Sequence, residues 1–121
     1  MKTARDIGFE KEKEVAAYLK KLKYKILDTN FRTRFGEIDI IAKQDGTIVF
    51  IEVKYRKSSF SGTPQELVTH SKQKKIIKSA IIYIKLRDIK DNVRFDVTAV
   101  NDNDIEIINS AFSIPEGLYY F

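Results

Sequence analysis

The chain has no cysteine and no tryptophan, and its 121 residues include a single histidine, two prolines and five glycines. Without cysteine it can form neither disulfide bonds nor thiolate metal sites, and it offers no cysteine nucleophile. One histidine, His70, excludes a multi-histidine metal centre. The low glycine and proline content excludes a collagen-like repeat or a low-complexity linker.

Long hydrophobic segments are also missing. Apolar runs such as Ile48–Ile51 are far shorter than the ~20 residues that a membrane-spanning helix needs. Residues 1–6 lead into charged sequence rather than into an apolar signal segment. With 43% hydrophobic and 32% charged residues, the composition is typical of a globular protein. We therefore expect residues 1–121 to form a single cytoplasmic domain without membrane association.

Charge is unevenly distributed along the chain, whose net charge is +5. Residues 1–34 and 54–90 are basic, with net charges of +5 and +8, whereas residues 35–53 and 91–121 are acidic, at −3 and −5. Basic flanks around an acidic centre are compatible with a phosphate-binding protein that also holds a cation. Lysine-rich helix faces that only keep a protein soluble are the other interpretation of this pattern.

Periodicity and turn residues predict two long helices and five strands. The helices are expected over residues 6–23, with Asp6 as the N-cap, and over 69–87, with a further helix start at Thr63-Pro64. The strands are expected over 24–30, 36–43, 47–56, 92–100 and 104–109, and Asp45-Gly46 predicts a hairpin turn between the second and third. This order predicts an α/β fold with a central mixed sheet flanked by helices.

Several acidic residues occupy strand positions where a sheet is usually apolar. Because side chains alternate along a strand, Glu37 and Asp39 are expected on one face and the neighbouring isoleucines on the other. The predicted hairpin would bring Asp39 beside Glu52 and Lys54 of the next strand. Glu12, on the inward stripe of the first helix, would join them if that helix packs there.

Carboxylates gathered in this way repel one another and lose hydration unless a cation neutralises them. Mg²⁺ prefers oxygen ligands, so Asp39, Glu52, Glu12 and the backbone carbonyl of Val53 form a candidate metal site. Lys54 beside this site could assist a water nucleophile or stabilise charge on a phosphate. Alternatively, Glu52 and Lys54 form an ion pair on a solvated strand face.

The start of the second long helix contributes further polar candidates. Gln73 begins the apolar stripe and would face inward near a helix N-terminus, where the dipole favours anions, although it could equally be the frayed edge of the stripe. The neighbouring lysines lie mostly off the stripe and are better placed for phosphate contacts. They are Lys72, Lys74, Lys75 and Lys78.

Several stretches of the sequence together resemble one family. They are Gly8 and Glu12 in the first helix, the runs 30–32 (NFR), 36–41 (GEIDII) and 50–56 (FIEVKYR), Lys72, 94–97 (RFDV) and 111–112 (AF). This combination, which covers nearly the whole chain, resembles the YraN family, also called UPF0102. That family is similar to the PD-(D/E)XK nuclease superfamily and to archaeal Holliday-junction resolvases. Ile38 stands where the superfamily name has proline, and Lys11 where the family often has a second glycine.

The resemblance implies a restriction-endonuclease-like αβββαβ core that hydrolyses DNA phosphodiester bonds with Mg²⁺ or Mn²⁺. It implies that Asp39 and Glu52 are metal ligands, that Lys54 is the catalytic lysine, and that Glu12 and Gln73 complete the site. It also suggests branched or flapped DNA as substrate and a homodimer. The expected phosphate-backbone contacts are Arg32, Arg34, Arg56, Lys57, Lys72, Lys74, Lys75 and Lys78.

Two alternatives to an enzyme stay open at this point. The same fold and basic surface could bind nucleic acid without cutting it, in which case binding would be salt-sensitive but independent of Mg²⁺. The chain could also bind a protein partner through the apolar residues 118–121; the other interpretation of these residues is that they cover the protein's own sheet.

Overall fold

The computed structural model describes residues 1–56 and 64–115, with the side chains of residues 64 and 65 excepted. Its elements are α1 (Ala4–Lys21), β1 (Lys25–Thr33), β2 (Gly36–Gln44), β3 (Thr47–Tyr55), α2 (Pro64–Leu67), α3 (His70–Leu86), β4 (Asn92–Val100) and β5 (Ile105–Phe112). The five strands form one mixed sheet in the order β1-β2-β3-β4-β5, in which only the β3–β4 pair is parallel among the described strands. The order and the mixed sheet confirm the expected restriction-endonuclease-like α/β fold.

Local sequence explains where the helices begin. The predicted N-cap of α1 at Asp6 is wrong, because Thr3 is the N-cap and Asp6 is its partner in a capping box. Thr3 Oγ1 accepts a hydrogen bond from the Asp6 amide at 3.1 Å, and Asp6 Oδ2 accepts one from the Thr3 amide at 3.0 Å. Thr69 caps α3 by accepting from the Lys72 amide at 3.2 Å. The predicted cap at Thr63 lies outside the described residues.

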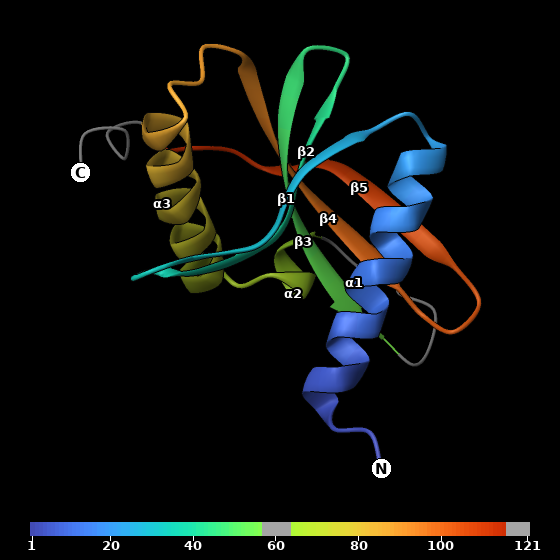
Figure 1. Cartoon of the computed structure of the whole chain (residues 1–121). Coiled ribbons are helices and arrows are strands. Elements are labelled where there is room, and N and C mark those ends of the chain that lie inside the picture. Colours follow the sequence, from blue (N-terminus) through green and yellow to red (C-terminus); the bar gives the residue numbers. More distant parts are fainter. Residues whose placement is uncertain (57–63, 116–121) are drawn as a thin grey trace.

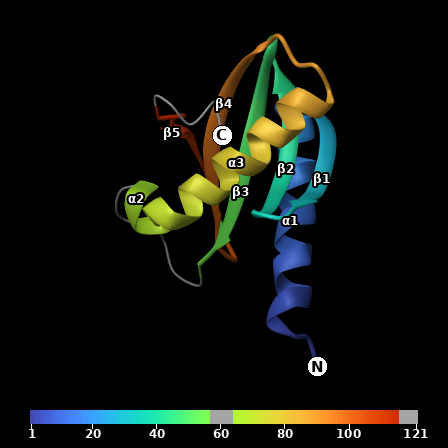
Figure 2. The same cartoon turned by 90° about the vertical axis from the view of Figure 1, so that its left-hand side faces the viewer.

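Two cores lie on opposite faces of the sheet, one under each long helix (Figure 1). The α3 face is filled by aromatic and aliphatic side chains such as Phe50, Phe95 and Ile77. The α1 face is smaller and includes Val15, Leu19 and Val49. Figure 2, turned by 90°, shows α3 crossing one face of the sheet while α1 runs along the other. The central strand β3 is therefore buried on both faces, as parallel-paired strands usually are.

The β1–β2 hairpin breaks the regular alternation of side chains. Ile38 packs into the α3 core whereas Ile40 packs into the α1 core, although residues two apart on a regular strand share a face. The backbone is irregular opposite this point, since Asn30 has a left-handed φ of 52° and lies between the paired positions Thr29↔Ile40 and Phe31↔Ile38. The expectation that the isoleucines share one face is therefore wrong.

This break also separates β2 from β3. Their pairing runs from Gln44↔Thr47 to Ile40↔Ile51 and goes no further among the described residues, while β1 and β2 stay paired to Thr33↔Gly36. The end of the hairpin crosses toward α3, where the hydroxyls of Thr33 and Ser79 lie 2.7 Å apart. The sheet is thus forked at Asp39 and Glu52.

Candidate active site

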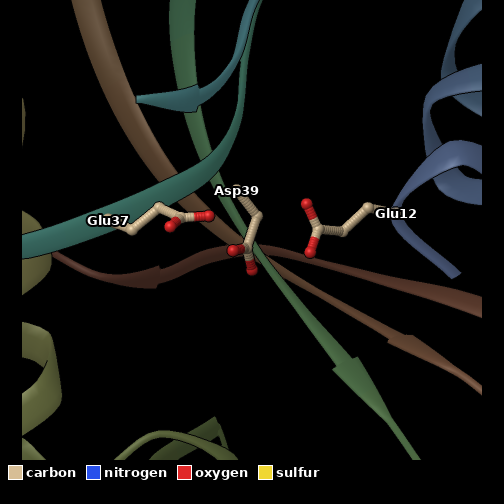
Figure 3. A group of neighbouring side chains, drawn as sticks. All are labelled: Glu12, Glu37 and Asp39. Carbon is tan, nitrogen blue, oxygen red and sulfur yellow. The ribbon is translucent and has the colours of Figure 1, made fainter. Parts of the chain in front are cut away.

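Acidic side chains from three elements meet at this fork. Glu12 reaches it from α1 and Glu37 from the hairpin, with Asp39 between them (Figure 3). Carboxylate oxygens of these three residues all lie within 4.8 Å of one another. Glu52 approaches Asp39 from β3, because these two residues lie just beyond Ile40↔Ile51, the last paired positions of the antiparallel strands β2 and β3. The sequence therefore predicted three of the four carboxylates as site residues, and Glu37 is the additional one.

Asp39 is the most perturbed member of the group. Its burial, followed by hydrogen bonding to Glu52 and the negative charge of Glu52, raises the pKa of Asp39 to about 9. The amide of Val53 donates to Asp39 Oδ2 at 2.8 Å and partly opposes this shift by lowering the pKa. Without a cation, burial beside Glu52 therefore favours the protonated form of Asp39.

Glu52 is only 3% exposed, yet its charge is incompletely matched. Its Oε2 lies 3.0 Å from Lys72 Nζ and 3.6 Å from Lys54 Nζ. The shorter contact has the distance of an ion pair, but Oε2 accepts no well-aligned hydrogen bond from any described residue. Burial would lower the pKa of Lys72, but the negative charge of Glu52 raises it above its ordinary value. Lys72 therefore remains a cation beside the site.

Asn30 connects the two outer carboxylates. Its Nδ2 donates to Glu12 Oε1 at 2.5 Å and to Glu37 Oε1 at 2.8 Å, and Arg32 Nε donates to the second oxygen of Glu37 at 3.1 Å. Burial raises the pKa of Glu12, the Asn30 hydrogen bond opposes this, and the charges of Glu37 and Glu52 raise it further. Asparagine tolerates the left-handed backbone of position 30 better than most residues do, so one residue supplies both the bend and the bridging amide.

The donor set fits a hard divalent cation. All the side-chain groups are carboxylates, which Mg²⁺ and Mn²⁺ prefer. Val53 can add a carbonyl oxygen, because the N–H and C=O of one strand residue point to the same side and its N–H already points to Asp39. The buried Glu52 oxygen and the raised pKa of Asp39 are both relieved by added positive charge. Asp39 is shared by two possible ligand sets, one with Glu12 and Glu37 and one with Glu52 and Val53.

A cleft of about 410 Å³ opens beside the acidic residues. Its lining includes Phe35, Gly36, Glu37, Asp39, Lys72 and Lys75. Lys72, Lys75 and Lys78 are spaced by three residues and so lie along one side of α3, whereas Lys74 is out of phase with them. Arg34 lies in the turn between β1 and β2, and Arg56 follows β3. Lys57 lies outside the described residues.

Gln73 occupies a different position from the other candidates. It is buried, as the apolar stripe predicts, but its Nε2 donates to the carbonyl of Val68 at 2.9 Å. Its described contact is therefore with the turn before α3 rather than with the carboxylates. Two residues with site contacts were not among the predicted ones. Glu37 could have been found from the shared-face argument for Glu37 and Asp39, whereas the role of Asn30 depends on a backbone bend that periodicity does not reveal.

Fold and site together define an α/β protein of the restriction-endonuclease-like class, with an acidic centre and adjacent lysines at the fork of its sheet. The model of the Uncharacterised protein family UPF0102 matches residues 11–100. The chain is 47% identical over 108 residues to a UPF0102 protein of Persephonella marina, covering 88% of this chain and 93% of the relative. It is 50% identical over 107 residues to one of Thermodesulfovibrio yellowstonii, covering 88% and 96%. The protein therefore belongs to the UPF0102 family, which confirms the resemblance.

The helices of the described residues also bear on the expected absence of membrane association. None of them combines the length and the apolar character needed to cross a bilayer.

Proposed function

We propose that this protein is a Mg²⁺- or Mn²⁺-dependent endonuclease that hydrolyses phosphodiester bonds in DNA, with branched or flapped DNA as its preferred substrate. The observation that carries the proposal is the meeting of Asp39, Glu52, Glu12 and Glu37 at the sheet fork, with two lysine ammonium groups against Glu52. The raised pKa values of Asp39 and Glu12, and a cleft that adds Lys72 and Lys75 to the acids, are typical of an active site rather than of a structural ion pair.

The carboxylates would hold the metal, with Asp39 as the shared ligand. A bound divalent cation would polarise a phosphate oxygen and favour deprotonation of water. Asn30 would keep Glu12 and Glu37 at a fixed separation, because its amide binds both. Coordination would require an ionised Asp39, so a proton held by this carboxyl without metal would be released on binding.

The lysines would act on the phosphate. Lys54 is only partly exposed and lies on the same face of β3 as Glu52, so its ammonium group can stabilise negative charge that develops on the scissile phosphate or orient the attacking water. Lys72 and Lys75 line the cleft and would bind the flanking phosphates. Contacts to phosphates carry no sequence information, which favours recognition of DNA shape.

A second function on the same fold is a nucleic-acid-binding protein without catalysis. It is favoured by the internal neutralisation of the acids, because Lys72 pairs with Glu52 and Arg32 pairs with Glu37. A protein of this kind would bind DNA in a salt-dependent way and would show no response to Mg²⁺. The alternative that uses residues 118–121 for a partner lies outside the described residues.

The decisive experiment compares labelled four-way junction, flap, duplex and single-stranded DNA with Mg²⁺, Mn²⁺ or chelator. The parent protein is expected to cut at least one of these only when metal is present, and Asp39→Asn is expected to bind DNA without cutting it. Asp45→Asn, in an exposed hairpin turn whose left-handed φ of 48° asparagine tolerates, is the matched control and should cut normally. Equal cutting by the parent and by Asp39→Asn would reject the site assignment.

Binding of the metal has a readout independent of cleavage. Mg²⁺ is expected to raise the thermal midpoint of the parent protein but not that of Asp39→Asn, because a ligand that binds only the folded state stabilises it. A two-fold homodimer, as paired cuts at a symmetric junction would require, is checked by light scattering with and without junction DNA.

A further inference from the structure

We propose that Arg34 and Phe35 form a stacking platform for an unpaired nucleobase next to the scissile phosphate. The proposal rests on the endonuclease function, and it names the substrate feature that the same cleft would recognise. It therefore predicts a preference for DNA in which at least one base beside the cut is unpaired, as at a flap or a splayed end. The platform residues lie in the turn between β1 and β2, and Phe35 lines the cleft.

Phe35 is a partly buried aromatic residue at the cleft. It is not among the described residues that make up the two hydrophobic cores, and it lines the same cleft as Glu37 and Asp39. An aromatic ring in a turn beside a phosphate-binding cleft matches proteins that bind single strands, where bases stack on aromatic side chains.

Cations accompany the ring. The Arg34 guanidinium carbon lies 4.8 Å from the Phe35 ring centroid and Lys78 Nζ lies 5.2 Å from it. Arg34 is exposed, so its planar guanidinium has the ring on one side and can offer its other side to a base. A base stacked there would carry its phosphate toward Lys75 and Lys72, which line the cleft.

The turn is held in place before any substrate arrives. Thr33 Oγ1 accepts from the Phe35 amide at 3.0 Å and also lies 2.7 Å from the Ser79 hydroxyl of α3. Gly36 has a left-handed φ of 146° and packs so that an added Cβ would lie 3.9 Å from that of Lys75. Binding at a preorganised site loses less conformational entropy than binding that must first order a loop.

The test measures binding to a fluorescein-labelled duplex that carries an unpaired oligothymidine arm, and to the same DNA with abasic residues in the arm next to the junction. Phosphates are identical in the two probes, so their difference isolates the base. Measurements in the Asp39→Asn background prevent cutting. Removal of the base is expected to weaken binding about tenfold, as the loss of one stacked base would.

Two variants assign this effect to the platform. Phe35→Leu keeps an apolar side chain without a π-face, and Arg34→Lys keeps the charge without the plane. Both are expected to bind the two probes equally, at the affinity of the abasic probe. The control is Arg5→Lys, at an exposed arginine whose guanidinium carbon lies 5.4 Å from the Phe9 ring centroid, and it should retain the tenfold difference. If Phe35→Leu lowers the thermal midpoint markedly, its effect on binding could reflect loss of the fold, and only the result for Arg34→Lys is then used.

The outcomes separate this proposal from the proposed function. Equal binding of both probes by the Asp39→Asn protein would overturn the platform, as would a base effect that survives in Arg34→Lys, and metal-dependent cutting by the parent would still stand. A base effect that depends on Arg34 and Phe35, found in a parent protein that cuts no DNA, would retain the platform and reject the endonuclease.

Discussion

Two buried carboxylates on the adjacent strands β3 and β4 are treated very differently by their surroundings. Asp96 is 1% exposed and accepts hydrogen bonds from Nε and Nη2 of Arg94, each at 2.9 Å, and from the Ser110 amide at 2.9 Å. Glu52 is 3% exposed, faces the carboxyl of Asp39, and has a lysine contact without hydrogen-bond alignment. The first arrangement satisfies its charge within the protein, whereas the second leaves its charge available to a ligand.

Complete hydrogen-bonded pairing, as at Asp96, therefore distinguishes a structural acid from a functional one such as Glu52 in the same sheet. Arg94 also donates to Gln44 at 2.9 Å and contacts the Tyr24 hydroxyl at 3.3 Å, so the Asp96 network joins β4 to neighbouring elements. The Asp39–Glu52 pair lies at the fork, just beyond the last of the described backbone pairs between β2 and β3. Four predictions test the contrast.

The largest effect is expected when Arg94 is replaced by methionine. This change leaves the Asp96 carboxylate buried without its partner, which costs about 3–5 kcal/mol of unfolding free energy. Urea denaturation measures the loss. The control is Arg87→Met, whose exposed pair with Asp28 at 3.4 Å should contribute no more than about 1 kcal/mol. Adding Asp96→Asn to Arg94→Met should recover part of the loss, and no recovery would contradict the unpaired-charge explanation.

Asp39→Asn should instead raise the free energy of unfolding of the metal-free protein. In metal-free protein at pH 8 the folded chain must protonate the buried Asp39 beside Glu52, whereas a neutral amide needs no proton and its oxygen can still accept from the Val53 amide. We expect a gain of about 1–2 kcal/mol in the free energy of unfolding, as is common when a functional residue that destabilises the protein is replaced. Urea denaturation in chelator gives the value, with Asp45→Asn as control. A loss of stability would mean that Asp39 is structurally satisfied, like Asp96.

The pH dependence of this gain follows from the same group. Burial and Glu52 raise the pKa of Asp39 in the folded protein above its unfolded value of about 3.9. The folded protein therefore keeps a proton that the unfolded chain has released, and its stability falls as the pH rises between the two values. The stability advantage of Asp39→Asn should accordingly be larger at pH 8.5 than at pH 5, and Mg²⁺ should reduce it. An advantage that is the same at both pH values would show that Asp39 is already ionised in the folded protein.

The smallest effect is expected for Asn30→Gly. Glycine adopts the left-handed backbone of this position, so the change removes mainly the amide that bridges Glu12 and Glu37. We expect a loss of about 1 kcal/mol in metal-free protein and recovery of much of this loss with Mg²⁺, which takes over the neutralisation. Thermal unfolding with and without Mg²⁺ measures both. Lys23→Gly, at another left-handed position with φ 72°, is the control and should show no such response to metal.

Much of the fold was predictable because its signals are local. The strands β2, β3 and β4 match the predicted ranges within about one residue, and the Asp45-Gly46 turn has the two left-handed φ values that its sequence favours. The start of α1 was missed because Thr3 and Asp6 are both good capping residues, and only their reciprocal hydrogen bonds show which one is the cap.

The site was predictable in composition but not in arrangement. Asp39, Glu52 and Lys54 follow from strand alternation and the hairpin, and the structure brings them together. The bend at Asn30 and Asp39 depends on long-range packing of the hairpin against α3, because Ile38 and Ile40 serve different cores. No periodic pattern contains that information, so Asn30 was missed and the isoleucines were assigned to one face.

The fork in the sheet also provides an internal spectroscopic probe. Most strand amides donate to carbonyls, but the Val53 amide donates to the Asp39 side chain. Its proton chemical shift and hydrogen-exchange rate should therefore report the protonation and metal occupancy of one carboxylate, while neighbouring amides such as that of Ile51 remain in the β-ladder. A nuclear magnetic resonance titration that follows this one peak could distinguish cation binding at the fork from cation binding elsewhere on the surface.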